Sequence, residues 1–349
     1  MPLFSYDPLQ YLDSIRLAKI HPGMLDDPVV KITLIPTRLS SELQYKALSY
    51  TWGDQSDRLV ISINAGDLET SATSFAELSI TRNCYNALCQ LRKLDRAEVT
   101  WIDAICINQE DLAERSSQVR IMGQIFALAQ QVIAYIGEET TESRIAFDEL
   151  AEADKTFSSI GKFERPKLSH EVVQGLDHIL QRSWFSRIWV IQEIANAQFA
   201  EFMCGSQTAS IYALYYAIFG YSENNRVTES YLPYVLGAHR DSFSQNQKAH
   251  IALWHLLART RRCLSSDPRD RIFALIPLIG PERQEVEALV DYDQPVEKVF
   301  TDFAKYMTPF LGPWLFLAVR HPHGLEMPSW VPDWSQNNAI SSKWSIFGR

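Results

Sequence analysis

The sequence predicts an α/β protein with an open, mainly parallel sheet, and three observations support this fold class. The first 75 residues contain four strand-like stretches, with period-two alternation at Leu59, Ile61 and Ile63. From residue 81 onward helical patterns alternate with apolar runs at 99–107 and 132–137. The connections between these segments are short, which favours a parallel sheet covered by helices, because neighbouring parallel strands need a crossover.

Each element follows from a local pattern. Turn-forming residues at 21–23 and 64–67 separate the N-terminal strands, which we expect to pair antiparallel. The predicted strands are 15–20, 29–36, 45–50, 58–63, 99–107, 132–137 and 200–205. The predicted helices are 84–94, 112–129, a mostly helical insert at 138–182, one apolar helix at 183–197, and helices near 208–220, 248–262 and 295–307.

This fold class also predicts where a ligand would bind. In open α/β sheets, ligands bind beyond the carboxyl ends of the parallel strands. Those ends would present residues 50–57, 103–111 and 137 onward. We therefore expect a cleft at that edge of the sheet.

Composition narrows the class of protein. The formal net charge of −9 argues against binding to a nucleic-acid backbone. The five cysteines are odd in number and lack the close CxxC pairs of zinc or redox sites, so we expect free thiols in a reducing compartment and no metal site. We see no signal-like leader and no apolar stretch of about 20 residues, so we expect a cytoplasmic protein without membrane insertion.

Four segments in order resemble the fungal heterokaryon-incompatibility (HET) family: YKALSYTWGD (45–54), WIDAICINQEDLAERSSQV (101–119), VIAYIG (132–137) and SWFSRIWVIQEIANA (183–197). DPRDRIFAL (267–275) and PSWVPDWS (328–335) look like downstream segments of the same family, so the resemblance covers nearly the whole chain.

The resemblance implies a role in self/non-self recognition and regulated cell death. It implies a HET domain at 1–205 and a mostly helical C-terminal region at 206–349 that packs on or follows it. It also implies two kinds of partner, a second copy of this chain or a partner incompatibility protein.

The family is in turn similar to TIR-type domains at two places, LSY (48–50) and WxxQE (189–193), where the latter resembles the TIR segment that carries a catalytic glutamate. This similarity implies a catalytic role for Glu193. On a continuous helix, Glu193 and Ser186 would share the only polar sector. The Glu193 carboxylate would then either point to water or face a cleft.

If Glu193 faces a cleft, hydrolysis of the bond between ribose and nicotinamide in NAD is the concrete hypothesis. Nicotinamide leaves as a neutral base, so no general acid is required, and one carboxylate can stabilise the oxocarbenium-like transition state. Trp52 and Trp189 would be the stacking surfaces. NAD is expected as a substrate, and no bound cofactor is expected.

The loop after the predicted strand at 45–50 supplies further candidate substrate-binding residues. Tyr50 ends that strand, and Gly53 and Asp54 either approach a ribose or phosphate or form a tight turn with Trp52 filling the core. Asp103 and Asn108 either line the same cleft or brace the strand-to-helix junction. Arg115 and Arg187 either pair with these carboxylates or contact a phosphate.

An alternative class of function remains open at this point. The chain contains no GxGxxG, GxxxxGK[ST] or GxSxG motif, so it lacks the local signatures of Rossmann, P-loop and α/β-hydrolase sites. Without a complete catalytic motif, a non-catalytic interaction module that signals through self-association or partner binding is the alternative to an enzyme.

Overall fold

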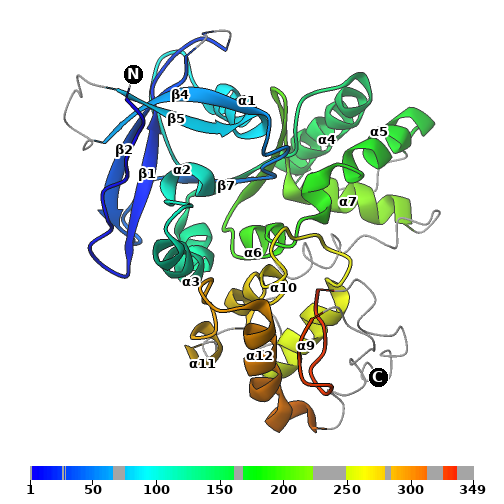
Figure 1. Ribbon diagram of the computed structural model, residues 1–349. Helices are drawn as coiled ribbons and strands as arrows, with labels where there is room; N and C mark the ends of the chain where they lie inside the picture. Colours follow the sequence, from blue (N-terminus) through cyan, green and yellow to red (C-terminus); the bar gives the residue numbers. More distant parts are fainter. Residues whose placement is uncertain are drawn as a thin grey trace.

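The computed structural model contains one continuous mixed sheet with helices on both sides and a helical C-terminal region (Figure 1). It describes residues 2–25, 27, 29–65, 75–160, 168–222, 249–279, 284–312 and 325–335.

The sheet has nine strands in the order β5-β4-β2-β1-β6-β3-β7-β8-β9. The strands are β1 (Ser14–Ile20), β2 (Lys31–Arg38), β3 (Lys46–Tyr50), β4 (Arg58–Ala65), β5 (Ala76–Thr81), β6 (Glu98–Trp101), β7 (Gln131–Tyr135), β8 (Ala200–Cys204) and β9 (Gln207–Ser210). The predicted α/β class with an open sheet is confirmed.

Parallel pairing is concentrated in one consecutive part of the sheet, β6-β3-β7-β8. Strands β6, β3, β7 and β8 are all parallel neighbours, with Lys46 opposite Gln131 and Tyr50 opposite Tyr135 in the longest of these registers. Four of the eight strand pairs in the described chain are parallel, the fourth being β2 with β4. The antiparallel pairs are β1–β2, β1–β6, β4–β5 and β8–β9. The predicted antiparallel pairing of the N-terminal strands therefore holds for β1 with β2, whereas β2 pairs in parallel with β4, and β3 pairs in parallel with β6 and β7.

The helices follow the predicted order along the chain. They are α1 (Arg82–Leu91), α2 (Asp103–Cys106), α3 (Leu112–Leu128), α4 (Thr141–Ile160), α5 (His170–Leu180), α6 (Val190–Ala195), α7 (Ile211–Ser222), α9 (Ala249–Arg259), α10 (Asp270–Phe273), α11 (Gln284–Glu287) and α12 (Val296–Leu311), with 3-10 turns η1 (Ser183–Ser186) and η3 (Ile276–Leu278). The helix α3 begins where the Asp111 side chain accepts hydrogen bonds from the backbone N–H groups of Ala113 and Glu114, both at 3.0 Å.

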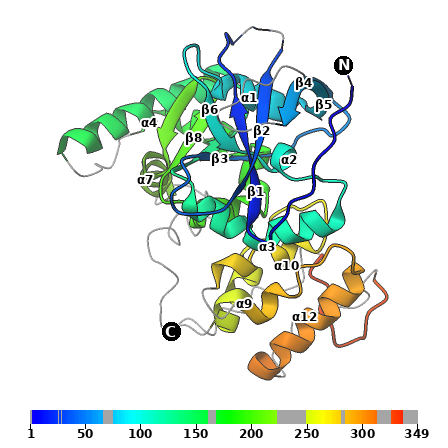
Figure 2. The ribbon, with the colours of Figure 1, turned by 90° about the vertical axis from the view of Figure 1, so that its left-hand side faces the viewer.

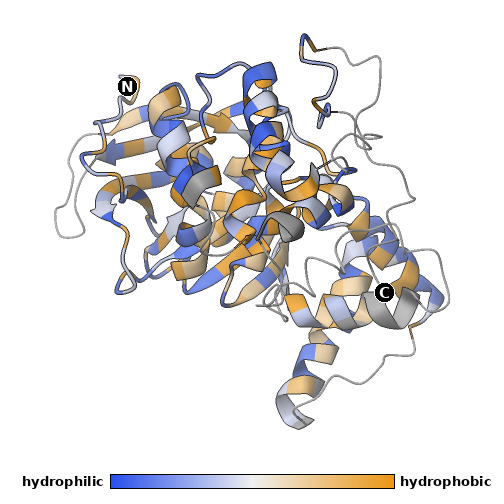
Figure 3. Cartoon of the chain, turned by 90° about the horizontal axis from the view of Figure 1, so that it is seen from below, coloured by the Kyte–Doolittle hydropathy of each residue, from blue (hydrophilic) through white to orange (hydrophobic). Residues whose placement is uncertain are grey.

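The C-terminal helices gather at one end of the molecule. Figures 1 and 2 show α9, α10 and α12 together, beyond α3 and away from the β4–β5 margin. The contacts run through α3 and α6, both of which pack against η3. Apolar residues are concentrated in the strands and on the inward helix faces (Figure 3). None of the helices in the described ranges combines the length and apolar composition needed to cross a bilayer.

Two predicted elements were wrong in part. The run 99–107 is a strand only through Trp101, and Asp103–Cys106 form the short helix α2. The single helix expected at 183–197 is divided into η1 and α6, because Arg187 is extended and forms an isolated bridge with Leu264. The backbone N–H of Ile188 donates to the Leu264 carbonyl at 3.0 Å. A tertiary contact has replaced the helical hydrogen bonds that the local pattern favours.

Candidate functional site

A cleft of about 810 Å³ opens at the carboxyl edge of the parallel strands. One wall is formed by residues 51–53, which follow β3, together with Asp103 and Gln109, which follow β6. The other wall consists of residues 264–270 and Tyr292 from the C-terminal region. This is the predicted position for a ligand site in an open α/β sheet, and the volume falls within the range of small-molecule pockets.

The ends of two neighbouring strands are tied together at the cleft. The Trp52 indole N–H donates to Oδ2 of Asp103 at 2.9 Å. Gly53 has a φ of +74°, which an L side chain rarely adopts, and this conformation turns the chain directly after Trp52. The sequence places glycine where the loop must reverse, and the turn fixes Trp52 against the cleft wall.

Arg187 connects the cleft to the buried carboxylate beneath it. Its Nη1 donates to the Tyr50 carbonyl at 2.5 Å and lies 3.5 Å from Oε1 of Glu193. Its Nη2 lies 3.4 Å from Oδ2 of Asp103. The predicted pairing of Arg187 with carboxylates is therefore confirmed, and the guanidinium spans Asp103 in the cleft wall and Glu193 below it.

Glu193 is only 3% exposed, although it lies in a six-residue helix at the end of the family segment. Its carboxylate accepts a short hydrogen bond from the Ser49 hydroxyl, which in turn accepts from the Trp184 indole N–H at 2.9 Å. Burial raises the pKa of Glu193 from 4.5 to about 7, against the lowering influence of Arg187 and Ser49. Near neutral pH this carboxyl group is therefore present in both its protonated and its ionised form.

A second buried acid lies in the opposite wall. Asp270 is 5% exposed and its Oδ1 accepts a hydrogen bond from the Tyr292 hydroxyl at 2.6 Å. Burial raises the pKa of Asp270 from 3.8 to about 6, and hydrogen bonds from Tyr292 and Trp189 partly oppose that rise. Two acids with raised pKa values thus flank the same cleft, one beneath the sheet edge and one in the C-terminal wall.

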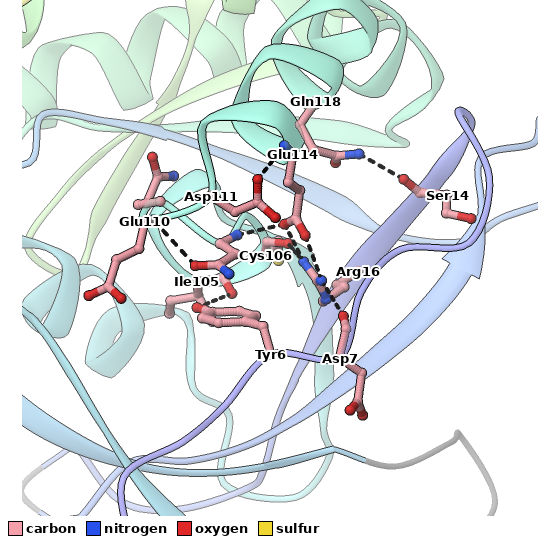
Figure 4. A network of polar contacts seen from close by, with 12 residues as sticks. Tyr6, Asp7, Ser14, Arg16, Ile105, Cys106, Glu110, Asp111, Glu114 and Gln118 are labelled. Atoms are coloured by element: carbon pink, nitrogen blue, oxygen red, sulfur yellow. Dashed lines mark hydrogen bonds and ion pairs between the residues drawn. The ribbon is translucent and has the colours of Figure 1, made fainter. Parts of the chain in front are cut away.

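A network of polar contacts stabilises the segment that follows Asp103 in the chain (Figure 4). Arg16 of β1 donates to both carboxylate oxygens of Glu114, at 2.6 and 2.9 Å, and to the Cys106 carbonyl at 3.1 Å. Glu114 also accepts from the backbone N–H of Asn108 at 2.7 Å. The turn between α2 and α3 is fixed by these bonds, so the cleft wall is rigid on this side.

The site residues predicted from the sequence fall into three groups, which line the cleft, lie beneath it or lie outside it. Trp52, Gly53, Asp103 and Trp189 line the cleft. Glu193 and Tyr50 lie beneath it, at 3% and 1% exposure.

The other two predicted residues lie outside the cleft. Asp54 lines a neighbouring hollow and accepts from the Ser56 N–H at 2.8 Å. The Asn108 side chain accepts from the backbone N–H of Glu110 at 3.3 Å, which is the bracing contact considered for it.

Several residues of the site were not singled out from the sequence. Ser49 lay within the quoted LSY motif, but strand alternation alone does not reveal a hydroxyl that contacts a residue 144 positions away. Asp270 lies within DPRDRIFAL (267–275), a segment that resembles the family but to which the sequence assigns no role. Tyr292 carried no signal, because its place in the cleft wall depends on packing between distant segments.

Cysteine and metal chemistry receive no support from the site. All five cysteines are free, as expected from their number and spacing. Burial raises the pKa of the Cys106 thiol to about 12, so it is protonated at neutral pH. Within the described ranges, no group of three or more His, Cys, Asp or Glu side chains is arranged to hold a metal ion.

Residues 45–193 match the family model described as "Heterokaryon incompatibility protein (HET)". Over 246 residues the chain is 31% identical to heterokaryon incompatibility protein 6, OR allele, of Neurospora crassa, a match that covers 60% of this chain. The matched part is 36% of that relative, so the chain spans about a third of its length. No solved structure matches the chain.

Proposed function

This chain is a HET-domain protein, and from that premise we propose that it acts in the cytoplasm in self/non-self recognition leading to cell death, by hydrolysing NAD at the cleft. The recognition role rests on the relationship to a heterokaryon-incompatibility protein. The enzymatic step rests on the cleft, and on the resemblance of WxxQE (189–193) to the TIR segment with a catalytic glutamate.

One observation carries the enzymatic proposal. Glu193 is buried directly below a cleft at the carboxyl edge of the sheet, and its pKa is raised to about 7. A structural ion pair would normally keep the pKa of a carboxylate low. A carboxyl group with a strongly raised pKa beside a cleft is typical of a functional site.

The proposed reaction needs a carboxylate and a water molecule. The bond between C1′ of the ribose and the nicotinamide nitrogen breaks, and nicotinamide leaves with the electron pair as a neutral base. Ionised Glu193 stabilises the positive charge that develops on the ribose, and water then bonds to C1′ and releases its proton. The products are nicotinamide, ADP-ribose and one proton.

Arg187 controls access to Glu193 in this proposal. Its guanidinium lines the cleft and lies 3.5 Å from the carboxylate, a long contact for an ion pair. Ribose hydroxyl groups would take over that contact when the substrate binds. Trp52 and Trp189, which both line the cleft, would provide aromatic surfaces for the nicotinamide ring.

The experiment is to measure nicotinamide release from NAD by purified protein at high concentration, for wild type and for Glu193→Gln. We expect release by wild type and at least a hundredfold loss in the variant, since the ionised group is removed. Glu201→Gln is the matched control, because Glu201 lies in β8, is half-buried, and bonds Gln131 away from the cleft. Equal release by wild type and Glu193→Gln would refute the proposal.

An interaction module is the second candidate, and one observation favours it. Glu193 does not itself line the cleft, since Arg187 occupies the position through which its carboxylate would be reached. If wild-type protein releases no nicotinamide under conditions that allow self-association, and Glu193→Gln still causes cell death, the cleft is a binding surface and signalling depends on assembly.

A further inference from the structure

Arg115 is a cation in the cleft whose guanidinium forms no hydrogen bond with the described part of the chain. It lies in the first turn of α3, its side chain is 28% exposed, and it lines the cleft. Its closest charged partner is Asp267, with Nη2 3.9 Å from Oδ2. Within the described ranges the Arg115 guanidinium donates no hydrogen bond, so its five N–H groups are available to a ligand.

The two other arginines of the cleft differ from Arg115. Arg269 donates to both oxygens of Asp267, at 2.9 and 2.7 Å, and to the carbonyls of Tyr292 and Gln294. Arg187 donates to the Tyr50 carbonyl and contacts two carboxylates. Asp267 is already paired with Arg269 at shorter distances, so Arg115 has no carboxylate within hydrogen-bonding distance in the described part of the chain.

Arg115 is nevertheless held in a defined position. Its guanidinium carbon lies 3.8 Å from the centre of the Tyr292 ring, which is the distance of a cation–π contact. Tyr292 is itself fixed at both ends, since its hydroxyl donates to Asp270 and its backbone N–H donates to the Ser116 hydroxyl at 3.0 Å. The guanidinium is thus oriented before any ligand arrives, which lowers the entropic cost of binding.

Two serines extend this polar surface. Ser265 and Ser266 line the same wall and precede Asp267 in the chain. Neither hydroxyl group forms a hydrogen bond within the part of the chain that the structure describes. Hydroxyl donors that line the same cleft as an oriented guanidinium match the oxygen-rich, negatively charged surface of a phosphate.

We propose that Arg115, with Ser265 and Ser266, binds a phosphate or diphosphate group, so that the cleft takes a nucleotide-class ligand with its phosphate against the C-terminal wall. The inference deepens the proposed function, because it uses the same cleft and NAD carries a diphosphate. It does not require hydrolysis. A nucleotide that is only bound, as a signal, would be held by the same groups.

The test is isothermal titration calorimetry of the full chain with inorganic pyrophosphate and with ADP-ribose. Arg115→Gln should weaken both affinities by about 10- to 100-fold, the range expected for loss of a charge-assisted hydrogen-bonded contact. The affinities of Arg115→Lys should lie between those of wild type and Arg115→Gln, because lysine keeps the charge but cannot form bidentate hydrogen bonds. Arg144→Gln is the control, since Arg144 is 65% exposed and pairs with Glu139 outside the cleft.

The outcomes separate this inference from the hydrolysis proposal. If wild type binds neither probe, or if Arg115→Gln binds both as wild type does, the phosphate site is refuted. If binding depends on Arg115 but wild type releases no nicotinamide from NAD, the site stands and the hydrolysis proposal fails. Nicotinamide riboside, which lacks phosphate, should bind wild type and Arg115→Gln equally. Circular dichroism of Arg115→Lys checks that the fold is retained.

Discussion

Two buried arginine–carboxylate pairs in this molecule differ in their geometry. Arg16 and Glu114 form two short hydrogen bonds, at 2.6 and 2.9 Å, with side chains 3% and 8% exposed. Arg187 and Glu193 share one contact of 3.5 Å, with side chains 19% and 4% exposed. The first pair, Arg16–Glu114, is almost completely buried and is called the closed pair below. The second, Arg187–Glu193, lies at the cleft and is called the open pair.

Under the proposed function, the same residue types serve stability in one place and chemistry in another. Burying a charge is costly unless short, well-oriented hydrogen bonds offset the loss of water. Glu114 has these bonds, including one from the Asn108 N–H at 2.7 Å. The contacts of Glu193 only partly offset the cost of burying its charge, so burial raises its pKa to about 7.

The largest expected effect is on stability, at the closed pair. Glu114→Ala should lower the free energy of unfolding by about 3–5 kcal/mol, because it leaves Arg16 buried without its counter-ion. Urea unfolding followed by tryptophan fluorescence measures the change. Asp13→Ala, which removes an exposed pair with Arg38, should change stability little. A loss at Glu114 no larger than the loss at Asp13 would show that the two buried pairs do not differ as described.

The next effect concerns pH and the open pair. The pKa of Glu193 is about 7 in the folded state, and its ordinary value is 4.5. Between these two pH values the carboxyl group keeps its proton in the folded state and loses it in the unfolded state. The contribution of Glu193 to the free energy of unfolding is therefore fully present below about pH 4.5, and it falls by roughly 3 kcal/mol as the pH rises to about 7. Glu193→Gln should remove this part of the slope when urea unfolding is compared at pH 5 and pH 8. An unchanged slope would contradict the raised pKa.

The strands and helices were predictable from sequence where burial alone sets the pattern. Ile61 and Ile63 are fully buried on one face of β4, so period-two alternation revealed that strand. The strand β5 was not predicted, because AELSIT has only its last two residues buried and pairs with a single neighbour. The break at Arg187 was also missed, since it depends on a bridge to Leu264.

The candidate site was predictable in location and only partly in membership. The carboxyl edge of the parallel strands follows from topology, and Trp52, Asp103 and Trp189 do line the cleft. The environment of Glu193 was not predictable, since a continuous helix would have placed it in a polar sector and the broken helix buries it. Residues such as Tyr292 reach the cleft through tertiary packing, which the periodicity of the local sequence does not reveal.

A smaller effect is expected from changing the counter-ion of the open pair. Arg187 lowers the pKa of Glu193 against the effect of burial, so Arg187→Gln should raise that pKa above about 7. A rise of about one unit corresponds to ~1.4 kcal/mol. The midpoint of the pH dependence of unfolding, measured relative to the Arg187→Gln/Glu193→Gln double variant, reports the shift. A midpoint that moves to lower pH would reverse the assigned role of Arg187.

The smallest effect is expected in the cleft wall. Trp52→Phe keeps an aromatic ring but removes the hydrogen bond to Asp103, so the free energy of unfolding should fall by about 1 kcal/mol. Thermal unfolding is sensitive enough to detect this change. Trp330→Phe, at a partly buried tryptophan away from the cleft lining, serves as the comparison. No difference between the two variants would indicate that the Trp52–Asp103 bond does not brace the wall.

The proposed function requires that Glu193, incompletely paired under the cleft, is the carboxylate that acts on the substrate. The most direct measurement is nicotinamide release from NAD by wild type and Glu193→Gln across pH 5 to 9. We expect wild-type kcat/KM to rise with pH through about 7, as Glu193 loses its proton, and the variant to show no such rise. Release that is absent at every pH, or that has the same pH profile in both proteins, would contradict it.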